Sequence, residues 1–156
     1  MKNLKKGFTL IELLVVVAII GILASVVLAS LNTARSKGTD AAIKANLTNT
    51  RAQAALYYDS NSSSYLGVCA AAVSANGIST GVQAASTAAG TGTVINTLTT
   101  AGTSTTAVCH DVGGTTTGYA AEVKLKSDTT NYFCVDSSGA AMTTATALAA
   151  SAVTCS

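Results

Sequence analysis

The chain has no proline and no tryptophan, and charged and aromatic side chains are scarce. Of its 156 residues, 10% are charged and 4% are aromatic, although 49% count as hydrophobic. Alanine supplies much of that hydrophobic share outside the N-terminal run, and large apolar residues become sparse after Leu56. A domain of this composition would be only marginally stable through hydrophobic burial, so we expect it to need covalent cross-links.

The motifs of common catalytic and binding sites are also missing. The sequence has no phosphate-binding glycine loop, no metal-ligand spacing and no base-binding motif. Cys109, His110 and Asp111 are adjacent, but neighbouring side chains point apart and catalytic triads are rarely built from them. Beyond Arg51 the only cations are Lys124 and Lys126, too few for a basic nucleic-acid surface. We therefore predict a protein that is not an enzyme, with no cofactor, no metal and no strong nucleic-acid site.

Four cysteines, Cys69, Cys109, Cys134 and Cys155, lie well beyond the N-terminal apolar run, and none forms a C-x-x-C motif. An even number in such a chain predicts two disulfides formed in an oxidising, exported compartment, each contributing about 3 kcal/mol in the chain-entropy model. Spacings of 40, 25 and 21 residues, with only His110 as an extra ligand, argue against a zinc site. Three connectivities are open; we favour Cys69–Cys109 with Cys134–Cys155, in which the loops neither nest nor cross.

The N-terminus is the most informative part of the sequence. Residues 13–34 contain no charged side chain, and a helix of that length spans about 33 Å, enough to cross a bilayer. The run is preceded by a basic leader that should keep this end cytoplasmic, with cations at Lys2, Lys5 and Lys6. Without residues 1–7, six basic and seven acidic side chains remain, so the positive net charge of +2 belongs to the leader.

One carboxylate, Glu12, lies at the edge of the apolar run. A charge at the centre of a membrane helix costs about 2.5–3.5 kcal/mol on insertion scales, and less near an end. It would be a needless cost in an ordinary signal peptide cut near Ala24 or Ala29. A simple structural reading is a capping box, with Thr9 as N-cap and Glu12 three residues later.

The sequence GFTLIEL at residues 7–13 strongly resembles the class III signal peptide of type IV pilins, over about residues 1–35. The resemblance implies cleavage after Gly7 by a prepilin peptidase and N-methyltransferase, then N-methylation of Phe8. It implies a precursor in the cytoplasmic membrane, an assembly platform there as partner, and a homopolymeric extracellular pilus on the cell surface. It also implies that Glu12 pairs with the amine of Phe8 in a neighbouring subunit.

The same resemblance suggests how the rest of the segment assembles. The intersubunit core would form from the apolar helix, with Leu13 in that core and Gly21, Ala24 and Ser25 as points of close approach. Many pilins have a proline where Ala29 stands in this chain. The pair Cys134–Cys155 resembles the loop that closes the C-terminal end of many pilins.

The chain divides into a leader peptide at 1–7, a hydrophobic transmembrane and assembly helix at 8–34, an amphipathic second half of that helix at 35–58, and a globular disulfide-bonded head at 59–156. The amphipathic half has a stripe formed by Ile43, Leu47, Ala54 and Tyr57 or Tyr58. A break near Gly38 is an alternative, with Thr39 or Asp40 capping a new helix.

Within the head, alternating residues at 119–126 and 131–136 predict an antiparallel hairpin, with a weaker third strand from Met142. The alternation places Tyr119, Ala121, Val123 and Leu125 on one face, and Glu122, Lys124 and Lys126 on the other. Residues 68–73 are read as a short helix, 86–92 and 99–106 as loops, and 94–98 as strand or helix. The predicted fold is α+β, a long protruding N-terminal helix packed by its C-terminal half on a small antiparallel sheet.

These observations predict a structural subunit of a type IV pilus filament, and specifically the major pilin, serving adhesion, motility or DNA uptake. The alternatives are a type II secretion pseudopilin, a minor or competence pilin, and a monomeric membrane-anchored or secreted domain that binds a surface ligand. Major pseudopilins often carry a calcium loop, and no run of closely spaced carboxylates occurs in this sequence.

Overall fold

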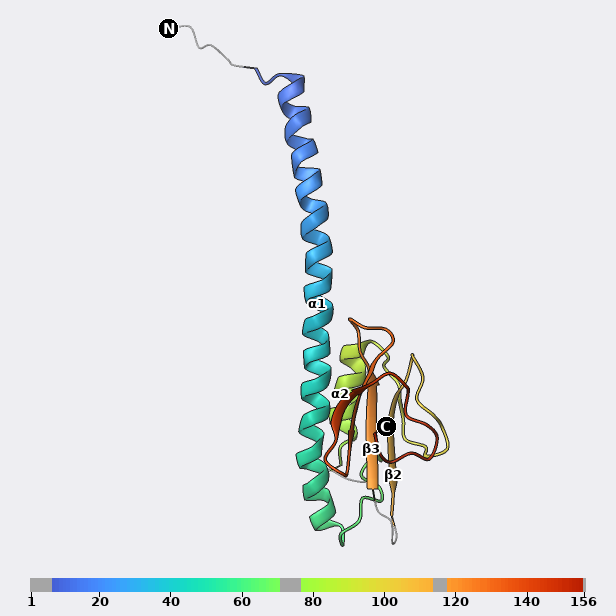
Figure 1. Ribbon diagram of the computed structural model, residues 1–156. Coiled ribbons are helices and arrows are strands. Elements are labelled where there is room, and N and C mark those ends of the chain that lie inside the picture. Colours follow the sequence, from blue (N-terminus) through green and yellow to red (C-terminus); the bar gives the residue numbers. More distant parts are fainter. Residues whose placement is uncertain (1–6, 71–76, 114–117, 156) are drawn as a thin grey trace. The chain divides into compact units, whose positions relative to one another are not determined.

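The computed structural model describes residues 7–70, 77–113 and 118–155, and divides the chain into two compact units, Met1–Arg35 and Ser36–Ser156. One helix, α1 (Leu10–Ser60), runs through both units (Figure 1). The helix is not interrupted at Gly38, so the alternative of a break there is wrong. Asp40 lies inside the helix, where its carboxylate accepts hydrogen bonds from the backbone N–H groups of Lys126 and Ser127. That contact fastens α1 to the hairpin and replaces the predicted capping role.

In its described residues, the second unit has one more helix and five strands: α2 (Ser79–Ala89), β1 (Val94–Ile95), β2 (Ala107–Val112), β3 (Gly118–Lys124), β4 (Tyr132–Asp136) and β5 (Ala141–Thr144). The strands form one sheet in the order β1-β2-β3-β4-β5. The predicted hairpin is β3 and β4, and β5 is the predicted third strand. Strands β2 to β5 are antiparallel, but β1 pairs parallel with β2, so the sheet is mixed. The parallel pair arises because residues 96–106 return the chain to the start of β1 before β2 begins.

Two local predictions need correction, and one strand was missed. Most of the loop predicted at 86–92 is the end of α2, whose buried residues Val82, Ala85, Ser86 and Ala89 follow a helical period. The helix ends at Gly90, which has a φ of 81° and adopts the left-handed conformation typical of a helix C-terminus. Strand β2 was not predicted. The short helix predicted at 68–73 is absent at 68–70, and its remainder lies outside the described residues.

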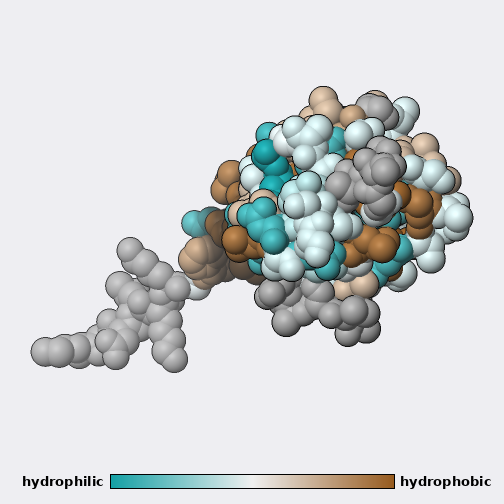
Figure 2. Space-filling model, turned by 90° about the horizontal axis from the view of Figure 1, so that it is seen from below, coloured by the Kyte–Doolittle hydropathy of each residue, from teal (hydrophilic) through white to brown (hydrophobic). Residues whose placement is uncertain are grey.

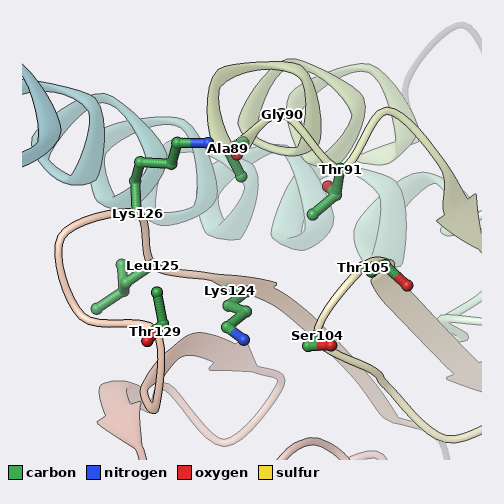
Figure 3. A pocket seen from close by; sticks show the side chains of 9 residues that line it. All are labelled: Ala89, Gly90, Thr91, Ser104, Thr105, Lys124, Leu125, Lys126 and Thr129. Carbon is green, nitrogen blue, oxygen red and sulfur yellow. Dashed lines mark hydrogen bonds between the residues drawn. The ribbon is translucent and has the colours of Figure 1, made fainter.

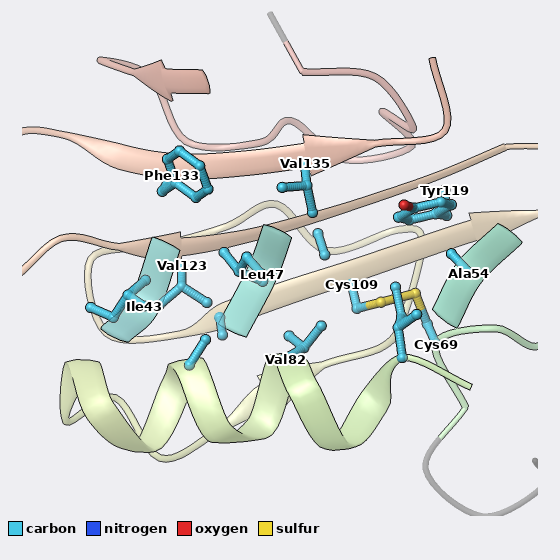
Figure 4. Close-up of a cluster of buried hydrophobic side chains, with 14 of the residues drawn as sticks. Ile43, Leu47, Ala54, Cys69, Val82, Cys109, Tyr119, Val123, Phe133 and Val135 are labelled. Atoms are coloured by element: carbon cyan, nitrogen blue, oxygen red, sulfur yellow. A yellow bond between two sulfur atoms is a disulfide. The ribbon is translucent and has the colours of Figure 1, made fainter. Parts of the chain in front are cut away.

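The main core lies between the sheet and the two helices (Figure 4). From α1 it receives the predicted stripe of Ile43, Leu47 and Ala54, all fully buried. From β3 it receives Tyr119, Ala121 and Val123, with Leu125 just beyond the strand, which is the face that the alternation predicted. Pairing an amphipathic helix with the apolar face of a sheet explains why residues 36–60 are helical despite few large side chains.

The opposite face of the sheet is also covered. Val108, Ala120 and Cys134 pack there against Leu148, and three polar side chains on that face hold the C-terminal segment, residues 147–155. Glu122 Oε1 accepts from the N–H of Leu148 at 2.8 Å, and Asp136 Oδ2 accepts from the N–H of Cys155 at 2.7 Å. The His110 ring nitrogens lie 2.9 Å from the carbonyl oxygens of Ala152 and Thr100. Glu122 is thus on the predicted face, but it is buried there.

Two disulfides close the second unit. The structure joins Cys69 to Cys109, and Cys134 to Cys155, which is the connectivity favoured from the sequence. The first ties the chain after α1 to the main core, and the second ties the C-terminal segment to β4. All four cysteines are in disulfides, so no free thiol remains as a ligand.

Candidate assembly segment at the start of α1

The N-terminal part of α1 presents apolar side chains on all sides. The large hydrophobic residues between Phe8 and Leu31 are 46–78% exposed. Among the described residues, α1 is the one helix long and apolar enough to cross a membrane. In the second unit the exposed large hydrophobics are scattered, and hydrophilic and hydrophobic atoms are intermixed on the face seen in Figure 2. A continuous apolar surface of this kind requires lipid or other helices around it.

The first turn of α1 is held by a reciprocal capping box. Glu12 Oε2 accepts from the backbone N–H of Thr9 at 2.9 Å and from its hydroxyl at 2.8 Å. The Thr9 hydroxyl oxygen in turn accepts from the N–H of Glu12 at 3.3 Å. The capping box predicted for Thr9 and Glu12 is therefore confirmed. The capping box does not use every acceptor position of Glu12. Its two carboxylate oxygens offer about four positions, so they can also bind a cationic partner.

The predicted close-approach residues lie away from Glu12 on the helix surface. At about 100° per residue, Gly21 lies about 180° from Glu12 around the helix, and Ala24 about 120°. Leu13 lies within about 80° of both Gly21 and Ala24. The hydroxyl of Ser25 donates to the carbonyl of Ile22 at 2.8 Å, so this polar group is satisfied within the helix. The segment thus has a charged side near its tip and a side of small residues further along.

Gly7 and Phe8 precede the helix without tertiary contacts that would fix their identity. A Cβ added to Gly7 would meet no heavy atom within 4 Å, and Phe8 is 78% exposed. Nothing in the described part of the chain therefore requires glycine at position 7. A requirement for a small residue there would have to come from another molecule that approaches the backbone.

The other residues considered from the sequence serve the fold of the second unit. Cys109 is in a disulfide, His110 faces two backbone carbonyls, and Asp111 Oδ2 accepts from the N–H of Gly67. These three neighbours therefore point to different partners and do not form a catalytic arrangement. Burial raises the pKa of the Asp111 carboxyl, although the hydrogen bonds from Gly67 and Cys69 oppose that effect. Gly7, Phe8 and Glu12 are local neighbours, whereas Leu13, Gly21 and Ala24 are spread along α1.

Comparison with known proteins gives one match. Residues 2–28 match the family model of the prokaryotic N-terminal methylation motif. No curated protein and no solved structure matches the chain. The match covers the basic leader, the expected cleavage region and most of the apolar run.

Proposed function

We propose that this chain is the major structural subunit of a type IV pilus. Its match to the prokaryotic N-terminal methylation motif at residues 2–28 supports a precursor of the type IV pilin-like or pseudopilin class. The observation that carries this proposal is the apolar helix surface beside a capped but still acceptor-rich Glu12. Such a surface suits two successive environments, first the bilayer and then a bundle of identical helices.

Processing creates the group that Glu12 needs. The motif implies cleavage by a prepilin peptidase, and hydrolysis of the Gly7–Phe8 bond leaves an amine at Phe8. N-methylation of that amine replaces one N–H but keeps the positive charge. A carboxylate surrounded by apolar helices is tolerated when it is paired with a cation. We therefore propose that Glu12 of one subunit binds the amine of Phe8 in the next, after the assembly platform has drawn the subunit from the membrane.

The geometry of the helix favours an open polymer over a closed dimer. The charged side and the small-residue side of α1 differ in chemistry and lie on roughly opposite faces. Contacts between two different faces are heterologous, and heterologous contacts that do not close into a ring continue as a helical filament. This argument supports filament formation by the homopolymer, with the second unit exposed on the cell surface for adhesion, motility or DNA uptake.

The proposal is tested by mass spectrometry of filaments sheared from the cell surface. We expect the most abundant chain in them to begin at N-methylated Phe8 and to weigh about four hydrogens less than the reduced chain, as two disulfides require. Retention of the processed chain in the membrane fraction would favour a pseudopilin, and presence in trace amounts would favour a minor or competence pilin. A chain cut near Ala24 or Ala29 would contradict the major-pilin proposal as well as the pseudopilin and minor-pilin alternatives.

Replacing Gly7 with leucine is expected to make the uncleaved precursor accumulate in the membrane, because a peptidase that requires close backbone approach cannot tolerate the side chain. The measurement is an immunoblot that separates precursor from processed chain. Gly38→Leu is the matched control, since Gly38 is also a glycine with open space around it. Normal processing of the Gly7→Leu variant would show that Gly7 does not define the cleavage site.

A further inference from the structure

We propose that a pocket between the end of α2, the loop before β2 and the β3–β4 hairpin binds the acidic group of a saccharide (Figure 3). The pocket has a volume of about 330 Å³, at the small end of ligand sites. It lies wholly within the second unit and does not depend on filament formation. Its lining residues are Ala89, Gly90, Thr91, Ser104, Thr105, Lys124, Leu125, Lys126 and Thr129.

Both positive side chains beyond Arg51 line this one pocket. Lys124 is the last residue of β3, and Lys126 follows two residues later in the turn. Lys124 is half-buried, with its ammonium 5.9 Å from the centre of the Tyr132 ring. The ammonium of Lys126 lies 3.4 Å from the carbonyl oxygen of Ala89. Each ammonium has three donors, so these contacts leave donors that can bind an anion.

Hydroxyl groups supply the second part of the site. Ser104, Thr105 and Thr129 are exposed at the rim, and Figure 3 shows Lys124 extending on the side of Ser104. The hydroxyl of Thr91 is bonded to Ser86, so it shapes the wall instead of binding a ligand. Hydroxyls both donate and accept hydrogen bonds, which suits a ligand that itself carries many hydroxyls.

The negative groups near the pocket are engaged elsewhere. None of the lining residues is acidic. Asp40 binds the backbone of Lys126 and Ser127, and Asp128 binds Thr130 and Asn131. The C-terminal end of α2 carries the negative end of the helix dipole, and Lys126 faces it. We therefore place the acidic group of the ligand by Lys124, Ser104 and Thr105, and the neutral ring hydroxyls toward Lys126.

This chemistry favours an acidic saccharide over a nucleic acid. Single-stranded nucleic acids are bound by aromatic platforms inside long basic grooves. Among the described residues, the lining of this pocket contains no aromatic side chain. One cation, Lys124, beside the hydroxyls of Ser104 and Thr105 matches one carboxylate or sulfate on a sugar.

The test is an NMR titration of the full processed chain in detergent micelles. The probe is trigalacturonate, and its trimethyl ester is the neutral ligand of the same shape. We expect amide shifts at Gly90, Ser104, Thr105 and Lys124 with the acid, at least tenfold weaker binding of the ester, and weakening by added salt. The chain is not assembled in micelles, so the saccharide proposal and the filament proposal are tested separately. Absence of saccharide binding would not contradict filament formation, and absence of filaments would not contradict saccharide binding.

Variants locate the site. Lys124→Gln is expected to weaken binding at least fivefold, and Lys44→Gln, which removes a cation outside the pocket, less than twofold. Ser104→Ala is a second variant at an exposed position that should not disturb folding, with an expected loss of at least twofold. Equal binding of acid and ester, equal effects of the two lysine variants, tighter binding of an oligothymidylate, or equally tight binding of inorganic phosphate would each overturn the proposal.

Discussion

Replacing Glu12 with alanine is expected to reduce the yield of sheared filaments at least tenfold while the precursor still inserts into the membrane. Removing one partner of a buried ion pair leaves the other charge unpaired, which costs about 3–5 kcal/mol. Here the unpaired group would be the methylated amine of Phe8 in each neighbouring subunit. Insertion should not suffer, because deleting a carboxylate makes the helix more apolar. The measurements are filament yield after shearing and the membrane-bound fraction of the chain.

Two further variants separate the pairing role from the capping box seen in the structure. Glu12→Gln keeps an acceptor for the N–H and hydroxyl of Thr9 but removes the charge. Thr9→Ala removes the hydroxyl from the box but keeps the charge. If Glu12 acts by pairing, Glu12→Gln should assemble as poorly as Glu12→Ala. Thr9→Ala should then give a filament yield close to that of the unmodified chain. The reverse order would reduce Glu12 to a helix cap.

The exposed apolar start of α1 could be predicted from the sequence because its signals are local. A run without charges, one carboxylate and a short motif are read directly from neighbouring positions. The β3–β4 hairpin was predictable for a similar reason, since Tyr119, Ala121 and Val123 alternate with residues of the other face. The break near Gly38 was a false alternative because a polar stretch of sequence need not end a helix whose apolar stripe packs on a sheet.

The parts that escaped prediction rely on small residues and backbone contacts. Helix α2 buries mainly alanine and serine, so its hydrophobic period is weak in the sequence. Strand β2 has both faces covered at Val108 and Cys109, so it shows no clear alternation of apolar and polar residues. The C-terminal segment is held by Glu122, His110 and Asp136 through its backbone. Such bonds leave no pattern in the sequence of the segment itself.

Among the side chains that hold the C-terminal segment, we expect Glu122 to have the largest effect on how stability depends on pH. Burial raises the pKa of this carboxyl from 4.5 to about 7, although the hydrogen bonds from Leu148 and Thr144 oppose the shift. Between these two values the unfolded chain releases the proton while the folded chain keeps it, so stability falls as pH rises. The loss is complete above pH 7 and amounts to about 3 kcal/mol.

Glu122→Gln is therefore expected to unfold like the unmodified chain near pH 4.5 and to be about 3 kcal/mol more stable at pH 8. Glutamine keeps an acceptor for the N–H of Leu148 but cannot ionise. The measurement is urea unfolding at several pH values, followed by tyrosine near-UV circular dichroism because the chain has no tryptophan. The difference between the two chains at each pH isolates Glu122 from the other titrating groups.

Asp128→Asn is the matched control, since Asp128 bonds only within its own turn, to Thr130 and Asn131, in hydrogen bonds that lower its pKa. Its stability difference from the unmodified chain should be constant between pH 5 and pH 8, because a carboxyl with a lowered pKa is ionised throughout that range.

Asp136 should also stay ionised between pH 5 and pH 8. Burial raises the pKa of its carboxyl, but hydrogen bonds from Ser138, Cys155 and Ala140 outweigh this and lower it. The C-terminal segment is thus expected to be held most firmly in mild acid, above the pKa of Asp136 and below that of Glu122. A Glu122→Gln difference that does not change with pH would mean that this carboxyl has the same pKa in the folded and the unfolded chain, and that burial does not govern its proton.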